Sequence, residues 1–168
     1  RNLVWFDERP LAFDCLEFDS DLRWIDILSE VAFLVMDLDS RKQQKLAYRF
    51  LNAYLEHTGD YGGMPVFRFY LVYRALVRAM VEGIRSGQSD ISTIEQETAA
   101  KAFCNYLKLA QSYCRPAIPI LIITHGLSAS GKSTLSQLLL EQIGALRIRS
   151  DIERKRMFGL LGGLNKKL

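Results

Sequence analysis

The sequence has few residues that could build a disulfide framework or a metal site. Three cysteines and two histidines occur in 168 residues, and no two cysteines stand in a CxxC spacing. So sparse and odd a set excludes the disulfide-rich secreted class and favours a reducing compartment. No uninterrupted apolar run approaches the ~18 residues of a membrane span, and the first residues lack the pattern of a signal peptide. The sequence therefore predicts a cytoplasmic protein with no membrane partner.

The chain also lacks an initiator methionine, so we expect an internal fragment of a longer protein. It has no strong overall charge either. Its 49% apolar and 24% charged residues are typical of a globular chain and exclude a disordered one. The net charge of +3 is unevenly distributed, because residues 1–118 carry −2 and residues 119–168 carry +5. A basic final segment favours an anionic ligand, either a nucleotide or nucleic acid.

Apolar periodicity divides the chain into a helical part and an α/β part. The helical part is predicted to contain a β-hairpin (3–6 and 11–14) and helices at 19–38, at 40–57 with Ser40 as N-cap, at 66–85 and at 92–113. Two prolines in the segment 115–119 mark a boundary. Beyond it we predict a central parallel strand (120–124), a helix (132–143), a short strand (146–148) and a helix from residue 152. This order is typical of the beginning of a βαβ fold.

Gly126 to Ser133 has the pattern G-x-x-x-x-G-K-S, which is the P-loop. Glycines allow backbone N–H groups to surround phosphate oxygens, and the helix that follows presents its N-terminus to the same anion. Lys132 would add a positive charge at the β- and γ-phosphates, and the Ser133 hydroxyl could ligate Mg²⁺. The predicted cofactors are ATP and Mg²⁺. The predicted nucleotide-binding residues are Gly126, Ser128, Ser130, Gly131, Lys132, Ser133 and Thr134.

A second candidate, Arg149 to Arg156, follows the predicted strand 146–148. Ligands of open α/β sheets bind beyond the carboxyl ends of the strands, so Asp151 could accept a proton from an attacking hydroxyl. Arg154 could hold an anionic group. A helix N-cap with a solvated basic face explains the same residues, and spacing alone leaves both interpretations open.

The segment from Gly126 to Arg156 resembles the small-molecule and polynucleotide kinases of the P-loop class. Members of the polynucleotide kinase type have an Asp after a strand about twenty residues beyond the P-loop, with an Arg three positions later. Asp151 and Arg154 match that pattern. The resemblance implies that Asp151 is the general base, with Arg154 and Lys132 also catalytic. A Walker B strand and an arginine-rich lid are absent from the sequence.

The helical part carries a second resemblance. The segments Phe13–Asp19, Arg23–Asp26 and Phe69–Arg78 resemble the C-terminal lobe of aminoglycoside phosphotransferase-like proteins. Joined to the P-loop, they resemble a bacterial fusion family of such a domain with a P-loop ATP-binding domain of the AAA type. The resemblance implies metal-ligand roles for Asn2 and Asp14, and makes Asp26 a buried acid that braces the catalytic loop. Without the resemblance, Asn2 and Asp14 are a terminal and a turn residue.

We therefore predict an α+β, mostly helical chain with two incomplete domains. Residues 1–115 would be part of a kinase-like C-lobe, 116–119 a linker, and 120–168 the first βαβ portion of a P-loop NTPase fold. The catalytic Asp of the first domain would precede the chain, so that domain is not expected to transfer phosphate.

The predicted function is ATP-dependent phosphotransfer to an unidentified hydroxyl acceptor. Two alternatives stay open: a nucleotide-dependent NTPase or regulatory module, and a helical scaffold in residues 1–118 with no site in use. Contact of the basic tail with nucleic acid is not favoured, since phosphate chemistry at an ATP site explains the charge more simply.

Overall fold

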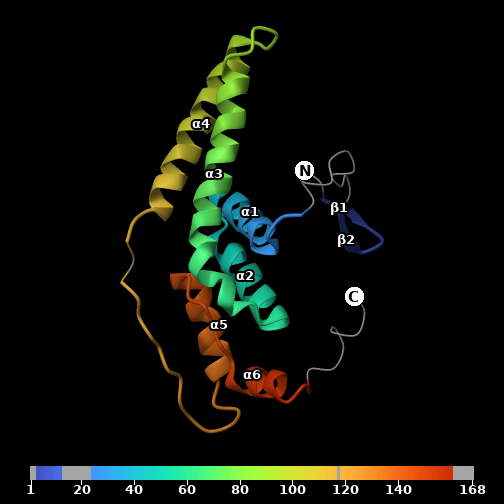
Figure 1. Ribbon diagram of the computed structural model, residues 1–168, viewed down its shortest axis with the longest axis vertical. Coiled ribbons are helices and arrows are strands. Elements are labelled where there is room, and N and C mark those ends of the chain that lie inside the picture. The colour runs from blue at the N-terminus through green and yellow to red at the C-terminus, as the bar shows by residue number, and fades with distance from the viewer. Residues whose placement is uncertain (1–2, 13–23, 117, 161–168) are drawn as a thin grey trace.

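The computed structural model describes residues 3–12, 24–116 and 118–160 (Figure 1). The chain opens with an antiparallel hairpin of β1 (Leu3–Phe6) and β2 (Arg9–Ala12). Asp7 and Glu8 form its turn at positive φ, 50° and 59°, which is the backbone of a tight two-residue hairpin connection. The predicted hairpin is confirmed. Its second strand begins earlier than predicted because the turn uses only two residues.

A helical part follows the hairpin. Its elements are α1 (Ile27–Ser40), α2 (Gln44–Thr58), the 3₁₀ turn η2 (Tyr61–Gly63), α3 (Met64–Ser86) and α4 (Thr93–Tyr113). Pro65 occupies the first turn of α3, where its missing N–H costs no hydrogen bond. Ser92 and Glu95 form a reciprocal capping box that fixes the start of α4. Both helices therefore lie close to their predicted ranges.

The prediction that Ser40 is the N-cap of the second helix is wrong. Ser40 is the last residue of α1, and its hydroxyl donates to the backbone oxygen of Asp37 at 2.7 Å. The two helices are joined by a short turn in which Lys42 has a positive φ of 61°, and α2 begins at Gln44. A serine near a helix boundary can satisfy a carbonyl of the preceding turn as well as an N–H of the following one.

One apolar core joins the helices of this part. Its buried members are Leu28, Val31, Ala32, Val35 and Met36 of α1, Ala47, Leu51 and Leu55 of α2, Phe67, Leu71 and Ala75 of α3, and Ala110 of α4. Towards their connecting turn, α3 and α4 project beyond α1 and α2 as a long antiparallel pair (Figure 1). Small residues such as Ala79 and Ala99 are buried along this pair and allow the two helices to approach closely.

The final part contains two helices, α5 (Lys132–Ile143) and α6 (Ser150–Met157). The prediction for α5 is confirmed, and α6 begins two residues before the predicted start. A long connector runs from the end of α4 to α5, and α5 packs beside α2 (Figure 1). None of the helices in the described ranges is both long and apolar enough to span a membrane.

Neither predicted strand of this part is a strand in the structure. Residues 120–124 and 146–148 form no strand and no ladder pairing, and Leu121 is 85% exposed. A parallel strand requires a neighbouring strand, and among the described residues only β1 and β2 pair with each other. The β-branched run indicates a buried strand by its composition, but composition alone supplies no partner for its backbone.

Candidate functional site

The P-loop residues form a tight turn between the connector and α5. Gly126 and Gly131 have φ values of 147° and 80°, and Ala129 is also at positive φ, 61°. The N–H of Ser130 donates to the backbone oxygen of Leu127 at 3.3 Å and closes the turn. Positive φ at both glycines is a conformation that other residues adopt only at a cost, so the structure explains the two glycines of the motif.

Lys132 is the first residue of α5, and its side chain folds back into the loop. The Nζ atom donates to the backbone oxygens of Gly126 at 2.8 Å and Leu127 at 2.5 Å, and to Ser130 Oγ at 3.2 Å. An ammonium group has three donors, and all three have acceptors here. The structure therefore brings together four of the predicted site residues, Gly126, Ser130, Gly131 and Lys132, around one positive charge.

The other predicted nucleotide-binding residues lie at the surface of the same loop and helix. Ser128 is in the exposed turn, and Ser133 and Thr134 are exposed in the first turn of α5. The backbone N–H groups of a first helical turn have no partner within the helix and favour an anion. Ser133 places a hydroxyl beside them, which is the kind of hard oxygen ligand that Mg²⁺ accepts. The donor set therefore fits a phosphate with its magnesium ion.

Asp151 lies in the first turn of α6. Its Oδ2 accepts a hydrogen bond from Arg149 Nη2 at 3.0 Å. Partial desolvation raises the pKa of Asp151, but the hydrogen bond and charge of Arg149 outweigh it, so the pKa lies below its ordinary value. Arg154 is exposed on the same helix. In the described residues, no hydrogen bond or ion pair joins Asp151 or Arg154 to the P-loop.

An interface between α2 and the segment before α6 is a feature that the sequence analysis missed. Asn52 of α2 is 3% exposed. Its Oδ1 accepts from the Arg147 N–H at 2.7 Å, and its Nδ2 donates to the Ala145 oxygen at 3.0 Å. Tyr61 adds a hydroxyl hydrogen bond to the Arg147 oxygen at 3.1 Å. The one sequence signal for this contact is Asn52 itself, a polar residue among the apolar residues of a helix face, since a buried polar group requires a hydrogen-bond partner.

Three arginines of the basic final segment converge on Glu56, near the end of α2. Arg147 and Arg149 contact its carboxylate at 3.0 and 3.2 Å, while Arg156 donates to its backbone oxygen at 2.6 Å and pairs with Glu153. Cations near a helix C-terminus are stabilised by the helix dipole. The positive charge of residues 119–168 therefore serves in part to hold α2, a role that the prediction of an anionic ligand did not include.

The metal ligands predicted from the second resemblance, Asn2 and Asp14, lie outside the described residues. Asp26 is described, and the prediction that it is a buried acid is wrong. Its side chain is exposed at the N-cap of α1, where Oδ1 accepts from the Leu28 N–H at 2.9 Å and Oδ2 from the Tyr70 hydroxyl at 2.9 Å. A carboxylate at that position stabilises the free N–H groups of the helix, so its role in this structure is local.

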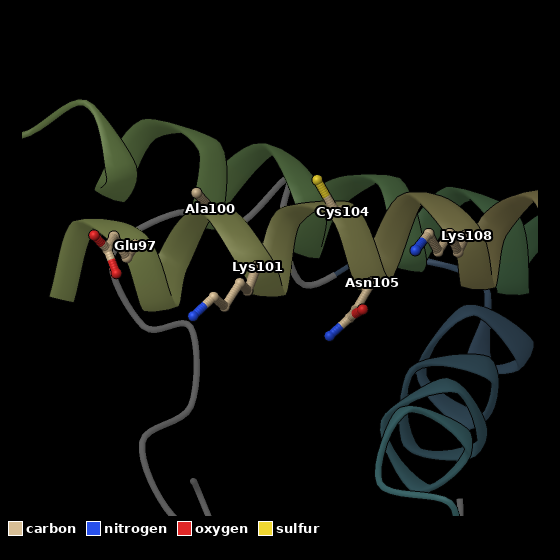
Figure 2. Close-up of a pocket in the computed structure, with 6 residues that line it drawn as sticks. All are labelled: Glu97, Ala100, Lys101, Cys104, Asn105 and Lys108. Carbon is tan, nitrogen blue, oxygen red and sulfur yellow. The ribbon is translucent and has the colours of Figure 1, made fainter. Parts of the chain in front are cut away.

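No cluster of three or more His, Cys, Asp or Glu that could hold a metal ion occurs in residues 3–12, 24–116 and 118–160. A hollow does lie along the outer face of α4 (Figure 2). It is lined by Glu97, Ala100, Lys101, Cys104, Asn105 and Lys108. All six come from one helix and none is a predicted site residue. The candidate site is therefore the P-loop with the start of α6.

Comparison with protein families supports the nucleotide-binding part of this assignment. Residues 121–167 match the family model of an AAA domain. The matched range contains the whole P-loop together with Asp151 and Arg154, and it begins just after the linker predicted at 116–119. The match supports a nucleotide-binding P-loop of the kind found in nucleotide-dependent enzymes.

Curated relatives extend the similarity to the helical part. The chain is 36% identical over 156 residues to uncharacterized proteins Rv2004c of Mycobacterium tuberculosis (strain H37Rv) and Mb2027c of Mycobacterium bovis. The alignment covers 93% of this chain, and the chain spans 30% of the length of these relatives. No solved structure matches the chain.

Proposed function

We propose that the chain forms the nucleotide-binding part of an ATP-dependent phosphotransferase. The observation that carries the proposal is the position of Lys132, whose ammonium group lies inside the P-loop on the oxygens of Gly126, Leu127 and Ser130. A phosphate group that enters the loop would offer this ammonium stronger, charged acceptors in place of three neutral ones. The loop and the first turn of α5 would supply backbone N–H groups to the same oxygens.

The side chains have distinct roles in this proposal. Ser128 and Ser130 lie in the phosphate-binding loop and Thr134 follows it in α5. Ser133 would hold Mg²⁺ with the terminal phosphates of ATP. The bound ion would supply positive charge to the phosphate oxygens. Asp151 would accept the proton of the acceptor hydroxyl, and Arg154 would hold an anionic group of the acceptor or of ATP. Positioning and electrostatic stabilisation account for the rate in such a reaction.

The pairing of Asp151 with Arg149 favours a second candidate function, a nucleotide-dependent NTPase or regulatory module. A carboxylate whose pKa lies below its ordinary value is a weaker proton acceptor. In such a module, the P-loop would bind and turn over ATP without an acceptor hydroxyl, and Asp151 would serve only to hold Arg149.

Two substitutions in the full-length protein test these functions. Lys132→Ala should weaken ATP–Mg²⁺ binding at least about tenfold in calorimetric titration, because a charged contact to phosphate is lost. Lys108→Ala, an exposed lysine on α4, is the matched control and should bind as wild type does. Equal affinity in Lys132→Ala and wild type would contradict nucleotide binding at this loop.

Asp151→Asn separates the two candidates. Under the phosphotransferase proposal it should bind ATP normally and lose about 100-fold or more in phosphate transfer to sugar, aminoglycoside or 5′-hydroxyl nucleic-acid acceptors. Under the alternative, ATP turnover should be unchanged by the substitution and by added acceptor.

We further propose that residues 1–115 are part of an aminoglycoside phosphotransferase-like C-lobe. The order of the elements, a hairpin followed by helices, is the observation that supports it. The full-length sequence tests it, since an H-x-D motif ending five residues before Asn2 is expected. Its absence would leave residues 1–118 as a helical scaffold.

A further inference from the structure

We propose that Glu56 of α2 is a positioning residue for Asp151, and that it acts through the Arg149 guanidinium that the two carboxylates share. The inference rests on the proposed function, in which Asp151 is the proton acceptor. Glu56 and Arg149 are 93 residues apart in the sequence and belong to the helical part and the P-loop part, respectively. A side chain of one part would thereby set the position of a reactive group in the other.

The geometry of Arg149 carries the first step. Its Nη1 donates to Glu56 Oε1 at 3.2 Å, and its Nη2 donates to Asp151 Oδ2 at 3.0 Å. The guanidinium is planar and rigid, so the two nitrogens fix the directions of both carboxylates. With one nitrogen engaged by Glu56, Arg149 has only a single contact with Asp151, and the other carboxylate oxygen of Asp151 is left without a contact to Arg149.

The second carboxylate oxygen of Glu56 connects these ion pairs to α5, the helix that follows the P-loop. Glu56 Oε2 accepts from Arg147 Nη2 at 3.0 Å, and Arg147 Nη1 donates to Gln137 Oε1 at 3.1 Å. Gln137 lies on α5, the helix that begins with Lys132. One carboxylate therefore holds the first turn of α6, through Arg149, and the helix that carries the P-loop lysine, through Arg147.

Burial decides whether these ion pairs matter. The Glu56 and Arg147 side chains are 22% and 19% exposed, and Arg149 is 36% exposed. Fully exposed ion pairs contribute little, whereas removing one partner of a largely buried pair leaves charges without acceptors. Without the Glu56 carboxylate, Arg147 Nη2 and Arg149 Nη1 would lose their acceptors. The carboxylate already in contact with Arg149 is Asp151.

A bidentate Arg149–Asp151 pair is the expected result. It would occupy the carboxylate oxygen that the proposed reaction needs and would make Asp151 a weaker proton acceptor. Glu56 thus keeps Arg149 from engaging Asp151 completely. The charged groups of this network are Glu56 on α2, Arg147 and Arg149 before α6, and Asp151, Glu153 and Arg156 on α6. Gln137, which accepts from Arg147, also donates to Glu141 of α5, and Glu141 pairs with Arg49 of α2.

The test is a titration of the Asp151 carboxyl carbon by ¹³C NMR in the full-length protein, with its signal assigned from Asp151→Asn. In Glu56→Gln, the midpoint should move to lower pH by about 0.3–1 unit, because a negative neighbour is lost and Arg149 turns fully to Asp151. Glu30→Gln is the matched control, since Glu30 pairs with Arg74 within the helical part. The control should leave the midpoint unchanged.

A double variant decides whether Glu56 acts through Arg149. When Arg149→Gln is already present, adding Glu56→Gln should shift the Asp151 midpoint by less than half of the shift that Glu56→Gln causes in the wild-type protein. Glu56→Asp, which keeps the charge, should keep most of the wild-type midpoint. An unchanged midpoint in Glu56→Gln, an equal change in Glu30→Gln, or an equal Glu56 effect without Arg149 would each overturn the proposal.

The titration does not depend on phosphate transfer, so the two proposals can fail separately. If Asp151→Asn leaves transfer intact, the proposed function is wrong and the titration still decides the role of Glu56. If Asp151→Asn abolishes transfer, Glu56→Gln should lower it about three- to tenfold with normal ATP affinity. Unchanged transfer in Glu56→Gln would then overturn the positioning role alone.

Discussion

The side-chain amide of Asn52 pairs with the backbone of Arg147 as a neighbouring strand would. Its oxygen accepts the Arg147 N–H at 2.7 Å, and its nitrogen donates to the Ala145 oxygen at 3.0 Å. These two bonds flank residue 146, and in a parallel ladder one residue likewise bonds to the two residues that flank its partner. Two backbone groups at the start of the segment predicted as a strand are therefore paired with a side chain of α2 in place of a neighbouring strand.

Replacing Asn52 tests how much this pairing stabilises the protein. Asn52→Leu leaves the Arg147 N–H and the Ala145 oxygen without partners, so we expect a loss of about 2–4 kcal/mol in the free energy of unfolding. Faster hydrogen exchange at the Arg147 amide should accompany it. Asn105→Leu, at an exposed position of α4, is the control and should change stability by less than about 0.5 kcal/mol. A similar loss of unfolding free energy in both variants would mean that the Asn52 hydrogen bonds do not stabilise the protein.

Gly144 provides a test of close packing at the same interface. It follows α5 at φ 69°, and a Cβ there would lie 2.3–2.7 Å from atoms of the Tyr48 ring and its hydroxyl. Gly144→Ala should therefore destabilise the protein by more than the ~1–2 kcal/mol of left-handed strain alone. Gly159→Ala has a similar φ of 65° and no atom within 4 Å, so it isolates the strain. Denaturant unfolding of the two variants should differ, and adding Tyr48→Ala should remove the excess cost of Gly144→Ala.

Asp39 is expected to make stability depend on pH. Burial raises its pKa, and the hydrogen bond from the Tyr113 hydroxyl at 2.7 Å lowers it by less. A carboxyl whose pKa is raised by folding stabilises the fold below its unfolded pKa, near 3.9, and this stabilisation is lost as the pH rises through the folded pKa. Asp39→Asn, which carries no charge, should therefore raise the midpoint of thermal unfolding by a few degrees at pH 7.

The gain from Asp39→Asn should shrink towards zero as the pH falls to about 3, where wild-type Asp39 is protonated. Asp37→Asn serves as the control, because Asp37 forms an exposed pair with Arg41 at 2.9 Å. The control should show no gain at pH 7. A gain for Asp39→Asn that is independent of pH would contradict the burial of its charge as the cause.

The helices and the P-loop could be predicted because their signals are local. Pro65 and the apolar spacing that follows it define α3, and the motif through Lys132 defines the start of α5. The fold prediction failed where a residue depends on a distant partner. Residues 120–124 have the composition of a strand, but no strand lies beside them in the part of the chain that the structure describes. Nothing near Glu56 in the sequence indicates the arginines about 90 residues later that contact it.

The predicted site shows the same division. The positions of the glycines and of Lys132 at the start of α5 follow from the motif, because eight consecutive residues define the loop and its charge. The role of Asp151 is implied by the resemblance to P-loop kinases, and neither that pattern nor the spacing could reveal that Arg149 holds its carboxylate. The basic composition indicated an anionic ligand, whereas three of those arginines contact α2, which only the tertiary structure could show.

The backbone of the P-loop yields a prediction for nucleotide affinity. Gly131 has a φ of 80° and no atom within 4 Å of a Cβ placed there, so Gly131→Ala would suffer from backbone strain alone. Relieving about 1–2 kcal/mol of strain by turning the loop would misdirect its N–H groups, and we expect ATP–Mg²⁺ to bind about 5- to 30-fold more weakly. Ala129→Gly is the matched control, because Ala129 already has a positive φ of 61° and glycine removes that strain. It should bind ATP as tightly as wild type, and calorimetric titration of both variants compares them directly. Equal affinity in Gly131→Ala and Ala129→Gly would mean that nucleotide binding does not require this loop conformation.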